Sequence, residues 1–292
     1  MSALDDAVVE LYRKAATSLP PDVVNALSIA RSHEAKGSRA SLALSVILEN
    51  IRAASKSARP LCQDTGIPVF FLRIPACVSY REVKNTIVKG TKLATRAVPL
   101  RPNAVDTLTE KNSEDNTGTG FPVIYCDEAR GNRLIIDLML KGSGSENIGQ
   151  TYKLPDEALF AERELDGVRK CVLDAVQKAQ GRGCPPYIIG VGVGATRDQV
   201  TRLSKEQLLR RLDDANRHPI LARLEKTIRD DVNALNIGPV GLGGRTTALA
   251  VKIAVNYRHP ATYFVDVSVA CWADRRARLI YDIQNSKYRI QS

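Results

Sequence analysis

Three of the six cysteines stand where a thiolate could bind a metal ion. They are Cys62, Cys184 and Cys271. Each lies at a junction between an expected strand and a loop, next to proline, glycine or polar residues, and a loop cysteine is free to present its thiolate to a metal. The remaining cysteines have apolar surroundings, which predict small buried core residues. They are Cys77, Cys126 and Cys171.

The spacing of the three loop cysteines limits the chemistry. They are far apart and include no CxxC pair, so a structural zinc site is disfavoured. Spacing alone leaves open whether the three thiols share one site. If they do, three thiolates leave one iron of a four-iron cluster without a protein ligand. That iron could act as a Lewis acid toward a hydroxy acid, like the open position of a catalytic zinc site.

The residues after Cys62 add further chemistry. Gln63, Asp64 and Thr65 place an amide, a carboxylate and a hydroxyl side by side before Gly66. So many competing hydrogen-bonding groups are rare inside a helix or strand. The segment is therefore expected to be a tight loop that displays its side chains at the edge of a strand.

The elements that must position these residues alternate in type. Residues 3–57 predict helices, separated at Pro20-Pro21 and capped again near Ser38. Ser79 and Glu82 form a capping-box pattern before a helix that reaches about Ala97. Further helices are expected at 155–179 and within 197–235, a long polar loop at 110–122, and strands at 67–74, 123–126, 133–140, 187–191, 263–269 and 277–283.

This alternation predicts an α/β, mixed α+β fold. We expect a single domain over residues 1–292, in which a helical N-terminal part (1–57) packs on a mixed-sheet α/β part (58–292) that carries the cysteine loops.

Two glycine runs resemble nucleotide-binding motifs without matching them. The run Gly190–Gly194 is GxGxG rather than GxGxxG, and no acidic residue follows at the expected position. We expect its glycines to let the backbone approach a cluster or another loop closely. Residues 243–247, Gly-Gly-Arg-Thr-Thr, lack the Gly-Lys-Ser/Thr order of a phosphate-binding loop.

Composition restricts the possible partners. The net charge of +10 favours anionic partners, which could be nucleic acids or small carboxylates. Nucleic-acid binding has only this charge in its favour, because basic clusters interleaved with aromatic residues and known binding motifs are missing from the sequence. An acidic N-terminus without a signal-peptide pattern, and no run of about 18 apolar residues, predict a cytoplasmic protein without a membrane contact.

Several motifs together resemble one family over nearly the whole chain. They are Cys62-Gln63-Asp64-Thr65-Gly66, the segments 100–106 (LRPNAVD), 115–118 (DNTG), 141–147 (KGSGSEN) and 190–194, Cys184-Pro185-Pro186, the segment 237–244, His259-Pro260 and the segment 271–276 (CWADRR). In this order the motifs resemble the alpha subunit of two-subunit class I (iron–sulfur) fumarate hydratases and L(+)-tartrate dehydratases.

The resemblance implies a role for each of eight residues. It makes Cys62, Cys184 and Cys271 the ligands of a [4Fe–4S] cluster with one iron lacking a protein ligand. It places three residues at the substrate: Gln63, Arg101 and Gly144. It gives catalytic roles to Asp64 and His259.

Side-chain chemistry agrees with these roles. The planar guanidinium of Arg101 suits a carboxylate better than a lysine would. Asp64 could move a proton or orient a water molecule, and His259, one of three histidines, could bind substrate or transfer a proton.

The implied activity is a hydro-lyase that reversibly hydrates fumarate to L-malate. The alternative is dehydration of L(+)-tartrate to oxaloacetate, because some motifs resemble one enzyme and some the other. In single-chain relatives a second domain supplies more arginines and the residues that abstract the proton. The resemblance therefore implies a beta subunit, without which this chain is inactive, an α2β2 hetero-oligomer and a small dicarboxylate substrate. A basic nucleic-acid-binding protein is the remote alternative.

Overall fold

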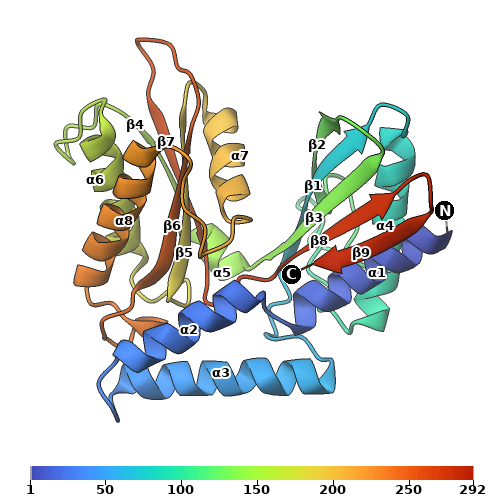
Figure 1. The fold of residues 1–292 in the computed structure, drawn as a ribbon, viewed down its shortest axis with the longest axis horizontal. Coiled ribbons are helices and arrows are strands. Elements are labelled where there is room, and N and C mark those ends of the chain that lie inside the picture. The colour runs from blue at the N-terminus through green and yellow to red at the C-terminus, as the bar shows by residue number, and fades with distance from the viewer. Residues whose placement is uncertain (1, 292) are drawn as a thin grey trace. The chain divides into compact units, whose positions relative to one another are not determined.

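The computed structural model describes residues 2–291, in which three helices come first and a mixture of helices and strands follows (Figure 1). The helices are α1 (Ser2–Thr17), α2 (Pro21–His33), α3 (Arg39–Ser57), α4 (Tyr80–Ala97), α5 (Ser143–Asn147), α6 (Leu165–Ala179), α7 (Arg197–Gln207), α8 (Pro219–Ala234) and the 3-10 turn η1 (Pro239–Gly241). The strands are β1 (Ile67–Pro75), β2 (Val123–Ala129), β3 (Arg133–Lys141), β4 (Gln150–Lys153), β5 (Tyr187–Gly194), β6 (Ala248–Val255), β7 (Phe264–Ala270), β8 (Arg276–Asp282) and β9 (Lys287–Gln291).

These elements form two compact units, and the chain passes between them four times. The first unit contains residues 1–21, 49–142 and 275–292, and the second contains residues 22–48 and 143–274. The mixed α/β class expected from the sequence is confirmed. The single domain over the whole chain stays a prediction.

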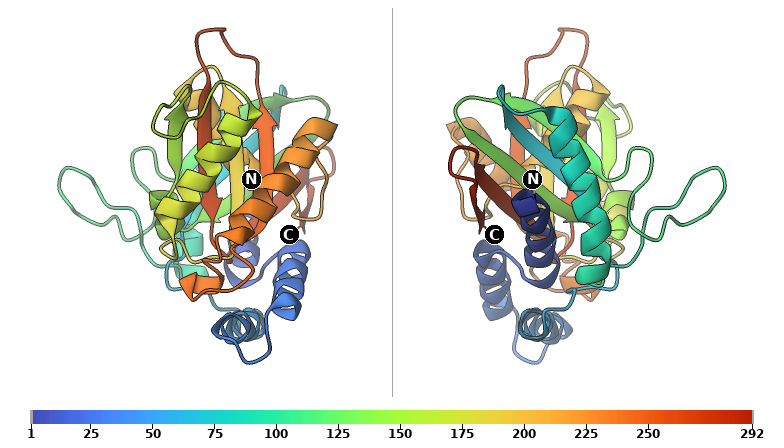
Figure 2. Two further views of the ribbon diagram at one scale, coloured as in Figure 1. Left: turned by 90° about the vertical axis from the view of Figure 1, so that its left-hand side faces the viewer. Right: turned by 90° about the vertical axis from the view of Figure 1, so that its right-hand side faces the viewer.

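The first unit is built on a five-stranded sheet in the order β2-β1-β3-β8-β9. Strand β2 is parallel to β1, and the other neighbours are antiparallel. Helices α1 and α4 lie side by side against this sheet (Figure 2, right). Alternate residues of the strands, such as Phe70, Leu72 and Leu138, bury their side chains against those helices. The sheet is thus apolar on the face that the helices cover.

The second unit is built on a four-stranded sheet in the order β4-β7-β5-β6. Helices α6 and α8 cover one face of the sheet and α7 covers the other (Figure 1). The face under α6 and α8 is the apolar core, where Ile189, Val191 and Val267 are fully buried. This core fixes the ends of β5 and β7, next to which Cys184 and Cys271 stand.

The three glycines of the run 190–194 form the face of β5 under α7, whereas Val191 and Val193 lie in the core on the other face. A Cβ atom at Gly190 would lie 2.1 Å from the carbonyl oxygen of Ser204, and one at Gly192 would lie 2.3 Å from that of Val200. Both carbonyls belong to α7, so the glycines allow this helix to approach the sheet closely. The run was expected to bring the backbone close to a cluster or a loop; the close partner is a helix.

Most expected elements are confirmed, and several boundaries are wrong. The helix expected from Pro155 begins only at Leu165, because residues 156–161 close a turn through the pair of hydrogen bonds between the backbones of Asp156 and Ala161. Ser79 precedes α4 but donates or accepts no capping hydrogen bond through its side chain. Strands β4, β6 and β9 were not expected.

Two of the predicted core cysteines are exposed instead. Cys171 is fully buried in α6, as expected. Cys77 lies in the exposed turn after β1, and Cys126 lies on β2, an edge strand with one neighbour and partly open faces. The apolar residues around Cys126 correctly predicted a strand, but they did not indicate that this strand lies at the edge of the sheet.

Candidate metal and substrate site

In the first unit, a hydrogen bond within the loop and close packing against β3 fix the shape of the loop after Cys62. The Asp64 carboxylate accepts a hydrogen bond from the backbone N–H of Gly66 at 3.0 Å, which closes a tight turn. Gly66 has φ 89°, and a Cβ atom there would lie 2.7 Å from the carbonyl carbon of Leu140 on β3. No other residue type fits this position, so the loop holds its shape at the start of β1.

The other end of the loop is held by the helices of the same unit. The backbone N–H of Leu61 donates to the carbonyl of Ala16 at 2.9 Å, and the Asn50 side chain donates to the carbonyl of Leu61 at 2.9 Å. Arg275 donates through its guanidinium to the carbonyl of Asp64. Each contact positions the backbone and leaves the side chains of Cys62 and Gln63 to project from the loop.

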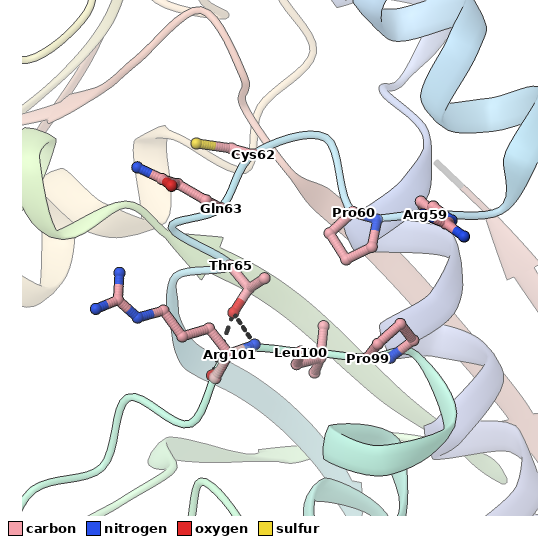
Figure 3. Close-up of a pocket in the computed structure, with 8 residues that line it drawn as sticks. All are labelled: Arg59, Pro60, Cys62, Gln63, Thr65, Pro99, Leu100 and Arg101. Carbon is pink, nitrogen blue, oxygen red and sulfur yellow. Dashed lines mark hydrogen bonds between the residues drawn. The ribbon is translucent and has the colours of Figure 1, made fainter.

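Arg101 lies beside this loop and shares a cavity of about 610 Å³ with it. Thr65 joins the two segments, because its hydroxyl accepts from the Arg101 N–H at 3.1 Å. The side chains of Cys62, Gln63 and Arg101 point to the same side of the loop (Figure 3). Their neighbours in the cavity lining are Arg59, Pro60, Thr65, Pro99 and Leu100.

The Cys62 loop thus brings together four residues that the sequence singled out: a thiol, an amide, a carboxylate and, from a separate segment, a guanidinium. The amide and guanidinium are hydrogen-bond donors, and the carboxylate is an acceptor. The amide and the guanidinium line the cavity together with the Cys62 thiol and can donate hydrogen bonds to a carboxylate ligand, whereas Asp64 is not among the lining residues.

In the second unit, the loops of Cys184 and Cys271 are hydrogen-bonded neighbours. The backbone N–H of Trp272 donates to the carbonyl of Cys184 at 3.1 Å. Strands β5 and β7 are antiparallel with Ile188 opposite Ala270, so the chain before β5 and the chain after β7 meet at one end of the sheet. Cys184 has φ 58°, an uncommon conformation for a residue with a side chain.

Tyr187 supports the Cys184 loop from within the core. Its buried hydroxyl accepts from the N–H of Gly183 at 3.2 Å and donates to the carbonyl of Gln180 at 2.6 Å. Burial raises the pKa of Tyr187 to about 12, and the neighbouring Cys184 and Cys271 shift it less strongly in the same direction. The hydroxyl therefore stays protonated and keeps both bonds at neutral pH.

Gly144 lies in α5, next to the same loop. A Cβ atom there would be 3.6 Å from the carbonyl oxygen of Arg182, an ordinary contact. Sterically the position therefore tolerates a larger residue. The substrate-binding role expected of Gly144 stays a prediction.

His259 does not lie with the two cysteines of its unit. It is exposed in the loop between β6 and β7, at the top of Figure 1, and its Nδ1 accepts from the N–H of Ala261 at 3.1 Å. This loop adjoins the start of β7 and the end of β5, whereas Cys184 and Cys271 lie at the opposite ends of these strands. The eight residues of β5 separate the two ends by roughly 23 Å.

Backbone N–H groups of the glycine turn at 243–247 bind a carboxylate from another part of the same unit. The buried carboxylate of Glu34 accepts from the backbone N–H groups of Arg245 at 3.1 Å and Thr246 at 2.9 Å. A Cβ atom at Gly244 would lie 2.6 Å from that of Ala40. The amides that could have held a phosphate are therefore used inside the fold, which agrees with the mismatch to a phosphate-binding loop.

The residues that support these loops were missed as functional candidates. They include Thr65, Asn116, Tyr187 and Arg275. Three of them belong to the motifs at 62–66, 115–118 and 271–276. A sequence motif does not reveal which distant backbone groups its polar side chains will bind.

The cysteines are not paired with one another. All six cysteines lie within residues 2–291 and none of them forms a disulfide. Within either unit, the described residues hold no group of three or more His, Cys, Asp or Glu side chains arranged around a metal position. No helix among residues 2–291 is both long and apolar enough to cross a bilayer.

Comparisons with known proteins identify the family of the chain. The sequence profile of the family described as Fumarate hydratase (Fumerase) matches residues 5–280. A protein of Geobacillus stearothermophilus, provisionally named a class I fumarate hydratase, is 43% identical over 94% of this chain and 54% of its own length.

Two further relatives are named as alpha subunits. One, from Methanocaldococcus jannaschii, provisionally named L(+)-tartrate dehydratase subunit alpha, is 39% identical over 94% of this chain and 96% of its own. L(+)-tartrate dehydratase subunit alpha of Escherichia coli O157:H7 is 30% identical over 96% and 91%. This chain therefore spans about half the length of the Geobacillus relative and nearly all of the two alpha subunits.

The chain belongs to the fumarate hydratase family. The match covers both units, and so includes every residue that the motifs singled out.

Proposed function

We propose that this chain is the alpha-type subunit of an iron–sulfur hydro-lyase that reversibly hydrates fumarate to L-malate. The observation that carries the proposal is the cavity beside the Cys62 loop, where Cys62, Gln63 and Arg101 point to the same side (Figure 3). A metal-binding thiol, an amide and a guanidinium in one cavity suit a carboxylate substrate that reacts at a metal.

The proposed cofactor is a [4Fe–4S] cluster held by Cys62, Cys184 and Cys271, with one iron lacking a protein ligand. Two features support this ligand set. The loops of Cys184 and Cys271 are bonded to each other, and Cys62 projects from a loop that Gly66 and Asp64 hold rigid. Thiolates are the usual protein ligands of such clusters. When bound, the cluster would supply Lewis acidity that helps a hydroxyl group leave as water.

The chain's own residues bind and orient the substrate in this proposal. The guanidinium of Arg101 donates two parallel hydrogen bonds to a substrate carboxylate, and the Gln63 amide donates a further one. Asp64 accepts a proton or orients the water that adds to the double bond. Gly144 leaves space for the ligand beside the Cys184 loop, since a Cβ atom there would meet no protein atom closer than 3.6 Å.

A catalytic role of His259 stays a prediction. Within its unit this histidine lies at the far end of β5 and β7 from Cys184 and Cys271. A His259→Asn variant decides the question: a loss of activity as large as that of Asp64→Asn supports proton transfer or substrate binding by His259, and wild-type kinetics remove it from the reaction.

The proposed partner is a beta subunit, in an α2β2 hetero-oligomer. Relatives of this chain's length are named as alpha subunits, and the Geobacillus relative is almost twice as long. A separate chain would therefore supply the remaining carboxylate-binding arginines and the base that removes the proton at C3. Thiolate ligands need a reducing compartment, so we place the complex in the cytoplasm.

L(+)-tartrate dehydratase is the second candidate. The relatives whose whole length matches this chain carry that name. Tartrate has a second hydroxyl where malate has none, so the two substrates differ in the polar groups that must be bound, and a site built for one discriminates strongly against the other.

The test is anaerobic co-expression with the candidate beta subunit, followed by assays with malate, fumarate and tartrate. Malate and fumarate should interconvert, and tartrate should react more slowly. A dominant tartrate rate would replace the first candidate by the second, and inactivity of an iron-loaded complex on all three substrates would refute a hydro-lyase of this class.

A further inference from the structure

Asn116 occupies a conformation and a position that only a few residue types can satisfy. It has φ 58°, in the left-handed region, where glycine and asparagine are the residues most easily accommodated. Its side chain is 2% exposed, in the long segment between α4 and β2. A buried amide in such a place needs partners for both its oxygen and its nitrogen.

The partners of the Asn116 amide are the backbone groups on either side of Pro102. Its Oδ1 accepts from the N–H of Asn103 at 2.6 Å, and its Nδ2 donates to the carbonyl of Arg101 at 3.1 Å and to the hydroxyl of Thr95 at 3.1 Å. One side chain therefore clamps the backbone before and after Pro102.

Thr65 extends this clamp to the Cys62 loop. Its buried hydroxyl accepts from the N–H of Arg101 at 3.1 Å and lies 3.4 Å from the Arg101 carbonyl. The Asn103 side chain donates to the Thr65 hydroxyl at 3.4 Å and to the Gly66 carbonyl at 3.3 Å. Arg101 is thereby tied to the same loop that carries Cys62, Gln63 and Asp64.

We infer that Asn116 is a positioning residue. With Thr65, it fixes the position of the Arg101 backbone, and so the point from which the Arg101 side chain extends, relative to the Cys62–Asp64 loop. The inference rests on the proposed role of Arg101 in binding a substrate carboxylate. Asn116 is not among the residues that line the cavity beside the Cys62 loop, whereas Thr65 lines it. Asn116 acts through the Arg101 backbone, and a displacement of about 1 Å at a substrate-binding group can reduce a rate on the order of 100-fold.

The sharpest variant is Asn116→Gly, which keeps the left-handed backbone and removes only the amide. The matched control is Asn236→Gly. Asn236 also has a left-handed φ, of 52°, but it is exposed after α8 and its side chain bonds only to the nearby Ala234 carbonyl. A second pair is Thr65→Val with Thr117→Val as its control, since the Thr117 hydroxyl bonds to Asp115 and not to the Arg101 segment.

The first readout is hydrogen–deuterium exchange of the peptide that contains Arg101 and Asn103, and it needs no activity. Pro102 has no N–H, so the amides of Arg101 and Asn103 dominate the signal. Exchange there should accelerate on the order of tenfold in Asn116→Gly and not in Asn236→Gly. Unchanged exchange in Asn116→Gly would overturn the clamp.

The second readout is a double-mutant cycle in the complex with the beta subunit, with malate as substrate. Asn116→Gly and Arg101→Lys should each lower kcat/KM by about 10- to 100-fold, mainly through KM, and the double variant should be no worse than Arg101→Lys alone. Multiplicative effects would show that Asn116 acts independently of Arg101 and would overturn the inference.

The two proposals fail in different ways. If the wild-type complex converts malate and Asn116→Gly and Thr65→Val match their controls, only the inference is wrong. If the iron-loaded wild-type complex converts neither malate, fumarate nor tartrate, the proposed function is wrong and the positioning of Arg101 for that reaction falls with it.

Discussion

At the scale of residues, the surroundings of each cysteine separate core thiols from potential ligands. Cys171 is buried in α6, and burial, followed by the charges of Asp156 and Asp174, raises its pKa to about 12. Cys62 and Cys184 are accessible at loops of their units. Only a thiolate is a good metal ligand or nucleophile, so Cys171 is not a candidate for either role.

Alkylation tests this difference. With iodoacetamide at pH 8, Cys171 should stay unmodified in the native protein, because burial raises the pKa of its thiol and keeps the reagent away from it. The exposed Cys77 and Cys126 serve as internal controls and should react. Mass spectrometry that finds Cys171 modified as fast as Cys77 would contradict its placement in the core.

Arg101→Lys should weaken substrate use. Lysine keeps the charge but loses the planar fork, so we expect kcat/KM for malate to fall by about 10- to 100-fold, with KM carrying most of the change. Arg130→Lys, in the exposed turn after β2, is the matched control. Equal kinetics of the two variants would remove Arg101 from the site.

Tyr187→Phe should destabilise the Cys184 loop. The variant leaves the Gly183 N–H and the Gln180 carbonyl without their partner, which costs about 1–3 kcal/mol of the free energy of unfolding. Chemical denaturation at pH 7, with Tyr80→Phe at an exposed position as control, measures this cost.

The stability difference between wild type and Tyr187→Phe should depend on pH. The pKa of Tyr187 is about 12 in the folded protein, above the ordinary value near 10. Its contribution to stability is therefore complete below pH 10 and is lost as the pH rises toward 12. The stability difference between wild type and Tyr187→Phe should shrink over that range, and a difference that grows would contradict the assigned cause.

At the scale of elements, the close approach of α7 to β5 depends on glycine. Gly192→Ala would place a methyl group 2.3 Å from a carbonyl oxygen of α7, so we expect a loss of about 1–3 kcal/mol or more in the free energy of unfolding. Gly118→Ala is the control, because nothing lies within 4 Å of its added methyl group. Equal stability of the two variants would contradict the packing of α7.

Local patterns in the sequence predicted most elements, and long-range contacts explain the failures. The apolar strand β6 was missed partly because it contains Lys252, whose ammonium is buried and bonded to Asp214 and to the carbonyl of Leu212. Strand β4 has only four residues. Neither a buried ion pair formed across the fold nor so short a strand has a periodic signal.

The candidate site was predictable to a similar degree. The thiol, amide, carboxylate and guanidinium around the Cys62 loop followed from motifs and side-chain chemistry. The clamp by Asn116 did not, because its partners at Arg101 and Asn103 belong to another motif and are backbone groups. Side-chain type can be read from a motif, whereas the distant backbone that it binds depends on the tertiary fold.

At the scale of the whole molecule, the proposed ligands are divided between the two units. Cys62 belongs to the first unit, and Cys184 and Cys271 belong to the second. The chain passes between the units four times, including once within α3.

An activity assay of the chain purified without its partner tests whether a beta subunit is required. Purified without oxygen and without a partner, the chain should turn over malate at least about 1000-fold more slowly than the co-expressed complex, because the proposed function assigns the base that removes the C3 proton to the beta subunit. Equal activity of the isolated chain would refute the need for a second subunit.

The most direct test of the account is the iron and acid-labile sulfide content of the complex purified without oxygen. Wild type should contain about four of each per alpha chain. Single changes of Cys62, Cys184 or Cys271 to serine should remove most of both, whereas Cys126→Ser, at an exposed position outside the proposed ligand set, should retain them. Wild-type iron and sulfide in all three ligand variants would contradict the central claim.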